Sequence, residues 1–234
     1  IKHIFISHLH GDHFYGLIGL VSSMHLLGRT KPLYIYGPRG LKEIIDIQLQ
    51  ASMTTLLYPL EFRETQSENP EVLFEDEHMK VSSFPMLHRI PTTGFIFSEK
   101  HYERKIWRDV IDLLKIPVHL LPAIKAGADY TAEDGTVHPN SVITIDPPAP
   151  RTYAFCSDTA YFEDIIPQVK GADLLYHETT FMNNRIANAT EKFHSTTGQA
   201  ATIAKKAGVK KLLIGHYSAR YDNLQPLLDE ARAV

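Results

Sequence analysis

Short apolar runs and helical apolar spacings alternate along the chain, and together they predict a mixed α/β protein. Runs rich in β-branched and aromatic residues predict strands at residues 1–7, 33–36, 60–65, 72–74, 79–84, 94–98, 152–157, 172–177 and 211–215. Apolar residues at helical spacing predict helices at residues 14–27, 41–53, 100–115, 162–171, 196–207 and 223–234. Only short polar turns separate the strands between residues 60 and 98, which indicates a β-meander.

The order of these elements distinguishes between two architectures. Strict alternation of strands and helices would favour a doubly wound sheet, but a meander interrupts the alternation. We therefore expect an α/β (α+β) fold of the αββα sandwich type. Residues 1–234 would form a single domain, and residues 116–150, which are rich in proline and weak in periodicity, would form an arm-like insertion. The chain enters its first strand directly at Ile1, with no earlier strand to pair beside it, so we expect that an N-terminal part is missing.

Composition narrows the possible function classes. The 13 histidines exceed the roughly five that average usage gives a chain of this length. The net charge of −3 carries no global basic signal, so any nucleic-acid contact needs a local basic patch. The single cysteine, Cys156, excludes an internal disulfide and suits a reducing compartment. Because no apolar run reaches about 18 residues, we expect a cytoplasmic protein that does not bind a membrane.

Four side chains of the metal-ligand type lie within six residues, directly after the first predicted strand. His8 and His10 are two positions apart, so in an extended segment they point to the same side and can bind one ion. Asp12 and His13 follow in the turn and face a second position. The order His-x-His-x-Asp-His therefore predicts the beginning of a site for two metal ions.

Further candidate ligands stand at the ends of later apolar strands. We predict one ion bound by His8, His10 and His88, a second bound by Asp12, His13 and His216, and Asp158 as a bridge between them. Imidazole and carboxylate ligands without a thiolate fit two Zn²⁺ ions per subunit, with Mn²⁺ or Fe as alternatives. Two ions roughly 3.5–4 Å apart would lower the pKa of a shared water towards 7, and Asp12 could accept its proton.

Five segments carry a resemblance to a known family. They are Ser7-His8-Leu9-His10-Gly11-Asp12-His13, Ser157-Asp158-Thr159, His177-Glu178-Thr179-Thr180-Phe181, His194-Ser195-Thr196 and His216-Tyr217-Ser218-Ala219-Arg220-Tyr221. Together they resemble ribonuclease Z, the tRNA 3′-end-processing endonucleases of the metallo-β-lactamase superfamily. The first segment indicates only the superfamily, whereas the third, fourth and fifth distinguish the family. The resemblance covers nearly the whole chain.

The resemblance carries expectations about fold, activity and assembly. It implies the αββα metallo-β-lactamase sandwich, metal roles for the seven ligands named above, and cleavage of precursor tRNA with Asp12 as proton acceptor. It also implies a homodimer in which the arm of one subunit clamps tRNA at the active site of the other. The family's Lys-x-Gly occurs in the arm as Lys125-Ala126-Gly127, so Lys125 is a predicted substrate-binding residue, but the family's Gly-Pro is absent. Family chains have a further N-terminal stretch, which agrees with a missing segment.

Other residues receive roles around the metal site. By the resemblance, His194 would lie near the leaving 3′-oxygen as proton donor or transition-state contact. Glu178 could orient His194 or a ligand imidazole as part of the catalytic set. Arg220 could pair with a phosphate oxygen of the substrate. A local basic cluster of Lys205, Lys206, Lys210 and Lys211 is either a tRNA contact or a solvated helix face.

Two alternatives to a tRNA endonuclease remain at this stage. The chain could be a metallo-β-lactamase-fold phosphodiesterase or hydrolase that acts on a small substrate, although such an enzyme does not need the insertion at residues 116–150. It could also be a metal-binding or RNA-binding protein without activity, but the complete set of ligand-type residues argues against that.

Overall fold

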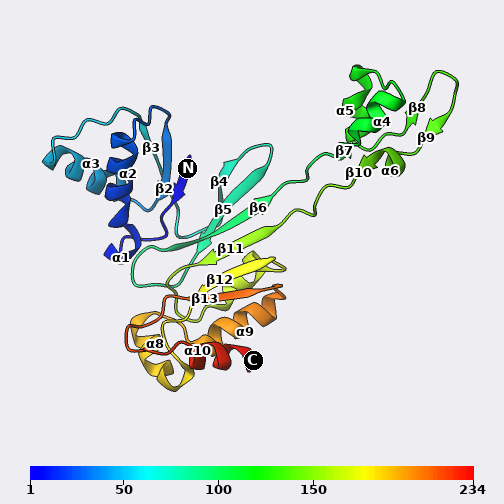
Figure 1. Ribbon diagram of the computed structural model, residues 1–234. Helices are drawn as coiled ribbons and strands as arrows, with labels where there is room; N and C mark the ends of the chain where they lie inside the picture. The colour runs from blue at the N-terminus through cyan, green and yellow to red at the C-terminus, as the bar shows by residue number, and fades with distance from the viewer. The chain divides into compact units, whose positions relative to one another are not determined.

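The computed structural model describes residues 1–234 and divides into two compact units. The first unit comprises Ile1–Ser98 and Thr152–Val234, and the second comprises Glu99–Arg151. Figure 1 shows the elements of both units. Each unit has a core of its own, so each is described separately below.

A three-stranded parallel sheet begins the first unit. It consists of β1 (His3–Phe5), β2 (Leu33–Gly37) and β3 (Leu60–Glu64), in that order. The helices α1 (Gly11–Phe14), α2 (Gly16–Leu26) and α3 (Leu41–Ala51) connect these strands. Buried aliphatic side chains from sheet and helices, such as Val21, Ile35 and Ile45, form one hydrophobic core. The predicted strand at 60–65 is therefore present, but it pairs with β2 and does not belong to the meander.

A six-stranded sheet forms the other half of the first unit, with the order β13-β12-β11-β6-β5-β4. Its strands are β4 (Glu71–Glu75), β5 (Met79–Pro85), β6 (Thr93–Glu99), β11 (Thr152–Cys156), β12 (Leu174–Glu178) and β13 (Leu212–Gly215). The helical segments of this half are η2 (Glu163–Ile165), α7 (Ile166–Val169), η3 (Asn183–Arg185), α8 (Ile186–Lys192), α9 (Thr197–Ala207) and α10 (Gln225–Arg232). A second core joins the sheet to α7 and α9 through residues such as Phe84, Leu175 and Ile203.

Aromatic side chains join the two sheets. Phe5 of β1 lies with its ring centroid 5.6 Å from that of Phe95 and 5.4 Å from that of Phe97, both on β6. Tyr36, Leu73 and Phe95 are buried in the same cluster. Because each sheet also carries helices on its own side, the first unit is the predicted αββα sandwich.

The second unit is a small helical body with short strand pairs. Its elements are β7 (Lys105–Ile106), α4 (Arg108–Leu113), η1 (Val118–Leu120), α5 (Leu121–Lys125), β8 (Tyr130–Thr131), β9 (Val137–His138), α6 (Asn140–Ile143) and β10 (Thr144–Ile145). Ile116, Ile124, Tyr130 and Ile143 form its buried core. The unit begins at Glu99, before the predicted start of the insertion at residue 116, because β7 pairs with β10 and draws the preceding segment into it. For the same reason the helix predicted at 100–115 is shortened to α4.

The longest helices, α2, α3 and α9, have 11 residues each. No helix in the chain has the length and apolar character that crossing a membrane requires. The helix α8 was not predicted, because its sequence, Ile-Ala-Asn-Ala-Thr-Glu-Lys, contains few apolar residues at helical spacing.

Candidate metal centre and active site

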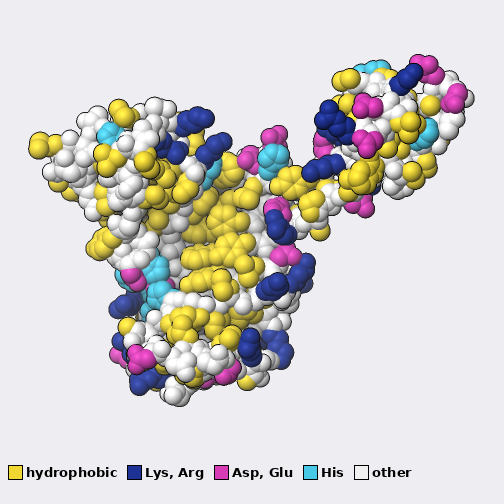
Figure 2. Space-filling model, in the orientation of Figure 1, with side chains coloured by type: hydrophobic (Ala, Val, Ile, Leu, Met, Phe, Trp, Pro, Cys, Tyr) yellow, Lys and Arg dark blue, Asp and Glu magenta, His cyan; other side chains and the backbone are white.

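The ends of the strands position the candidate ligands. His8 and His10 follow β1, and His13 lies on α1 directly after them. Asp158 follows β11 and His216 follows β13, so side chains far apart in sequence meet beyond the carboxyl ends of parallel strands. Figure 2 shows histidine side chains gathered beside α1.

Asp158 is the centre of this group. Its side chain is only 4% exposed, and its Oδ2 atom lies 3.7 Å from Nε2 of His8 and 3.4 Å from Nε2 of His13. The same oxygen lies 3.9 Å from Nε2 of His88, and Oδ1 lies 3.3 Å from Nε2 of His216. One buried carboxylate therefore faces four imidazole nitrogens.

The possible ligand atoms fall into two main groups. His8, His10, His88 and Asp158 form one group, and Asp12, His13 and His216 form the other. Within each group the ligand atoms lie within 4.8 Å of one another, and Asp158 also approaches His13 and His216 of the second group. The structure thus brings together all seven residues that the sequence suggested as ligands, in the grouping expected. A third group of Asp158, His194 and His216 overlaps both.

Unsatisfied polar atoms test whether this site fits a metal ion. Nε2 of His8 and Oδ1 of Asp158 are buried and have no hydrogen-bond partner. Nε2 of His13 lies 3.2 Å from Nε2 of His216, and Nε2 of His88 lies 3.2 Å from Nδ1 of His10. Converging ring nitrogens and a buried carboxylate oxygen without a hydrogen-bond partner are costly in an apolar interior but are the donors that a divalent cation requires. The residues present therefore fit bound metal.

Burial and charge shift the pKa values of the predicted ligands, in directions that differ from one ligand to the next. Burial lowers the pKa of His8 to about 3 and also lowers the pKa of His88, so both rings are neutral. Burial acts in the same direction on His13, but the Asp158 carboxylate outweighs it and raises the pKa of that ring. Burial would raise the pKa of Asp158, yet its hydrogen bond to His13 and the nearby histidines lower it, so Asp158 is a carboxylate.

Hydrogen bonds on the far side of the rings hold two ligands in place. Nδ1 of His88 lies 2.8 Å from the carbonyl oxygen of Phe193, which can only accept, so His88 presents an unprotonated Nε2 to Asp158. Phe193 adopts a left-handed conformation with φ 57° at the end of α8. Nδ1 of His8 lies 3.0 Å from Oγ of Ser7, which in turn contacts Oγ of Ser157 at 3.0 Å.

Comparison with known proteins places this geometry in a family. A model of the Beta-lactamase superfamily domain matches residues 107–217. Ribonuclease Z of Bacteroides fragilis is 47% identical over 234 residues, which make up 100% of this chain and 77% of that protein. Ribonuclease Z of Phocaeicola vulgatus is 48% identical over 231 residues, which make up 99% of this chain and 75% of that protein. The chain belongs to the ribonuclease Z family.

Solved structures agree with this membership. The crystal structure of human tRNase Z, short form, matches with a TM-score of 0.65 and 28% identity, covering 95% of this chain and 74% of that one. A long form of RNase Z from yeast matches with a TM-score of 0.65 and 15% identity, covering 96% of this chain and 29% of that one, and supports the fold alone. The sandwich is therefore the metallo-β-lactamase fold, as predicted, and the family consists of metal-dependent hydrolases.

Glu178 lies at the centre of a buried network beside the ligands. It is 0% exposed, and its Oε1 accepts hydrogen bonds from the backbone N–H of Ser195 at 2.9 Å and of Thr159 at 3.2 Å. Nδ1 of His194 lies 2.9 Å from the same oxygen. Burial lowers the pKa of His194, but the bond to Glu178 outweighs it, so the pKa is raised. Glu178 is therefore shielded from solvent and placed where it can orient His194.

The two basic residues assigned to the substrate lie in different units. Arg220 is exposed in the loop after β13, its guanidinium lies 5.1 Å from the ring centroid of Phe181, and its Nε donates to Oγ of Ser218 at 2.9 Å. Phe181 also contacts the ring of His194, with centroids 6.2 Å apart. Lys125 is exposed at the end of α5 in the second unit and is not among the residues that gather around Asp158.

The lysine cluster near the end of the chain is largely engaged within the protein. Lys206 pairs with Glu163, and Nζ of Lys210 lies 2.6 Å from Asp173. Nζ of Lys205 donates to the carbonyl oxygen of Val234 at 2.5 Å. These contacts favour the interpretation of the cluster as a solvated, ion-paired face.

Thr180 is a site residue to which the sequence analysis assigned no role. Its hydroxyl oxygen lies 2.8 Å from Oε2 of Glu178, 2.8 Å from Nδ1 of His216 and 3.2 Å from Nδ1 of His194. The signal was present in the sequence, because Thr180 belongs to the His-Glu-Thr-Thr-Phe segment that distinguishes the family. The spacing of residues alone did not show that one hydroxyl meets three site residues.

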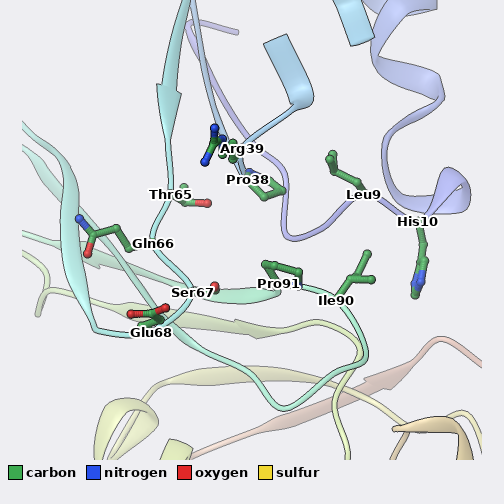
Figure 3. A pocket seen from close by; sticks show the side chains of 10 residues that line it. All are labelled: Leu9, His10, Pro38, Arg39, Thr65, Gln66, Ser67, Glu68, Ile90 and Pro91. Carbon is green, nitrogen blue, oxygen red and sulfur yellow. The ribbon is translucent and has the colours of Figure 1, made fainter. Parts of the chain in front are cut away.

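A pocket adjoins the metal centre at His10 (Figure 3). Its volume is about 680 Å³, which is within the range of small-ligand sites. The lining residues are Leu9, His10, Pro38, Arg39, Thr65, Gln66, Ser67, Glu68, Ile90 and Pro91. The lining combines apolar side chains with hydrogen-bonding ones and with one positive and one negative side chain, those of Arg39 and Glu68.

Proposed function

We propose that the chain is a metal-dependent endoribonuclease that cleaves precursor tRNA at its 3′ side, removes the 3′ trailer and leaves a 3′-hydroxyl. The observation that carries this proposal is the convergence of seven ligand-type residues, with the buried Asp158 among them, beside a buried His194–Glu178 pair. Relatives that share close to half of the sequence are named Ribonuclease Z, and the human structural neighbour is a tRNase Z.

Two Zn²⁺ ions per subunit are part of the proposal, with Mn²⁺ or Fe as alternatives. His8, His10 and His88 would hold one ion, Asp12, His13 and His216 would hold the other, and Asp158 would bridge them. When bound, such ions lower the pKa of water and stabilise the negative charge that develops on a phosphodiester.

The chain's own residues supply the proton transfers and the orientation of the substrate. Asp12, whose side chain is 69% exposed, accepts the proton of the attacking water. His194 donates a proton from Nε2 to the leaving 3′-oxygen, while Glu178 holds its Nδ1. Arg220, held over Phe181, pairs with a non-bridging phosphate oxygen. The pocket beside His10 offers space for a nucleotide next to the scissile bond.

The proposed assembly follows from the way in which the substrate would be bound. Precursor tRNA is the partner, the protein acts as a homodimer, and the second unit with Lys125 contacts tRNA bound to the other subunit. A cytoplasmic location follows from that choice of substrate. The compact core of the second unit, around Ile124 and Tyr130, supports a defined binding element instead of a loose connection.

One experiment separates this proposal from its two alternatives. The zinc-loaded protein is incubated with a precursor tRNA and, separately, with bis-(p-nitrophenyl) phosphate, with chelator-treated protein as the control. We expect a single cut at the 3′ side of the tRNA that disappears on metal removal. Cleavage of the small ester alone would support a small-substrate phosphodiesterase, and RNA binding without cleavage of either compound would support an inactive binding protein.

A further inference from the structure

We propose that the Thr180 hydroxyl is a positioning group that links the predicted metal ligand His216 to Glu178. The Glu178 carboxylate would then orient two rings: His194 directly, and His216 through Thr180. This inference rests on the proposed function only for the role of His194. The link between Thr180 and His216 concerns metal binding and can be tested without any substrate.

Hydrogen-bond capacity decides the direction of this link. Thr180 has a single O–H to donate, while its oxygen can accept two hydrogen bonds. Glu178 as a carboxylate can only accept, and its Oε2 already faces the backbone N–H of Thr180 at 2.8 Å. The hydroxyl at 2.8 Å from the same oxygen therefore donates to Glu178. Two ring nitrogens remain near the Thr180 oxygen. Nδ1 of His194, at 3.2 Å, lies closer to Glu178, at 2.9 Å, whereas Nδ1 of His216, at 2.8 Å, is a donor to the Thr180 oxygen.

This direction fixes the tautomer of His216. With its proton on Nδ1, the ring presents an unprotonated Nε2 to the site, where Oδ1 of Asp158 lies 3.3 Å away and Nε2 of His13 lies 3.2 Å away. A metal ligand needs that lone pair, and the partner of the other ring nitrogen selects it. Nδ1 of His194 is held by Glu178 at 2.9 Å, so the ring of His194, like that of His216, has its Nε2 directed away from the Glu178 carboxylate.

Burial and backbone contacts make the link strong. Glu178 is 0% exposed and Thr180 is 8% exposed, so water does not compete for these bonds. Backbone bonds join the two loops, from the N–H of Thr179 to the carbonyl of Gly215 at 2.8 Å and from the N–H of Ser218 to the carbonyl of Thr180 at 3.2 Å. His216 itself has φ 59°, an uncommon conformation for a residue other than glycine. The loop therefore keeps a strained residue at the point where its ring meets Thr180.

The test compares three variants with the parent protein. Thr180→Val keeps the shape of the side chain and removes the hydroxyl, and Thr180→Ser restores the hydroxyl. Thr179→Val is the matched control, because the Thr179 hydroxyl donates to a backbone carbonyl, that of Gly215 at 3.0 Å, and to no ring. The affinity for Zn²⁺ alone is measured by competition with a chelator, and kcat and KM are measured with bis-(p-nitrophenyl) phosphate.

We expect Thr180→Val to weaken one Zn²⁺-binding step by roughly 10–100-fold, as loss of a hydrogen-bond partner behind a ligand does. It should lower kcat more than it raises KM, and Thr180→Ser and Thr179→Val should bind Zn²⁺ like the parent. Parent-like affinity in Thr180→Val would overturn the inference, and so would an equal loss in Thr180→Val and Thr180→Ser, because that would indicate packing.

A second measurement uses the unaltered side chain of Thr180. The measurement is a ¹⁵N NMR spectrum of the histidine rings of the parent protein, with the His216→Asn variant to assign the signal of His216. We expect His216 to carry its proton on Nδ1. A proton on Nε2 would overturn the inference even if Thr180→Val does not fold. The proposed function fails separately: a parent protein that binds Zn²⁺ but leaves precursor tRNA intact would refute the nuclease, while the tautomer of His216 would still decide the role of Thr180.

Discussion

Two aspartates in the site lie in different surroundings, and this difference separates their roles. The side chain of Asp158 is 4% exposed and faces four histidine rings, whereas that of Asp12 is 69% exposed. Oδ2 of Asp12 lies 3.4 Å from Nε2 of His13 and 3.8 Å from Nε2 of His216. Only Asp12 combines closeness to the ligand nitrogens with access to solvent, and this is the basis for proposing it, and not Asp158, as the proton acceptor.

Replacement of Asp12 tests that role. We expect Asp12→Asn to lower kcat for precursor tRNA by roughly 10²–10⁴-fold, because a positioned general base contributes about that much. Circular dichroism should show an unchanged fold, since the side chain is exposed and supports no core. Asp222→Asn, which removes another carboxylate from the chain, is the control and should keep parent activity. Normal turnover by Asp12→Asn would remove Asp12 from the mechanism.

Arg220 should act on RNA and not on the metal ions. We expect Arg220→Ala to raise KM for precursor tRNA by about tenfold, equivalent to about 1.4 kcal/mol, because a charge-assisted bond to phosphate is lost. The zinc content, measured by atomic emission, should remain that of the parent. Arg232→Ala removes an exposed arginine at the end of α10 and serves as the matched control. Loss of zinc in Arg220→Ala would instead assign Arg220 to the support of the ligands.

At the scale of elements, the parallel strands β11 and β13 end at the predicted ligands Asp158 and His216, and β12 lies between them. Leu175 on β12 is 0% exposed and belongs to the core beneath α9, while Leu213 on the neighbouring β13 is 50% exposed. We expect Leu175→Ala to lower the free energy of unfolding by about 2–5 kcal/mol, because it leaves a cavity. Leu213→Ala should cost roughly half of that or less. Equal losses in urea unfolding curves would show that β12 does not form the packed centre of this sheet.

The local sequence pattern predicted where the strands lie better than it predicted which strands pair with each other. The apolar run at residues 60–65 indicates a strand, and β3 is there, but its parallel pairing with β2 depends on long-range contacts that periodicity does not encode. The segment that includes Trp107 has helical spacing, yet the two residues before Trp107 form a strand because Ile106 pairs with Thr144. Tertiary pairing overrides local propensity in the second segment, whereas in the first it decides only the partner of the strand.

The ligands could be predicted because their chemistry is visible in single residues. His88, Asp158 and His216 each stand at the end of an apolar run, and the parallel pairing of β12 with β11 and β13 brings the ends at Asp158 and His216 to one edge of the sheet. Thr180 and Phe193 could not be assigned in this way. A threonine hydroxyl and a backbone carbonyl are common in every sequence, and only their positions behind His216 and His88 give them a role.

At the scale of the whole molecule, the second unit is inserted at one point of the sandwich. Ser98 of β6 and Thr152 of β11 are paired in antiparallel register, so the two ends of the inserted segment leave the sheet side by side. None of the residues that gather around Asp158 comes from Glu99–Arg151. The metal site and the insertion can therefore be separated by a deletion that leaves the sheet intact.

Replacement of Glu99–Arg151 by a short glycine-containing turn between the paired ends tests the insertion as a tRNA-binding element. We expect the shortened protein to fold, to bind zinc, and to hydrolyse bis-(p-nitrophenyl) phosphate with a kcat near that of the parent. Its kcat/KM for precursor tRNA should fall by roughly 10²-fold or more, because a second contact on a shared substrate contributes avidity of that order. Lys125→Ala, which keeps the unit and removes one exposed charge, should give a smaller loss. Undiminished tRNA cleavage by the shortened protein would place tRNA recognition entirely on the sandwich, since the ligands and His194 are all retained there.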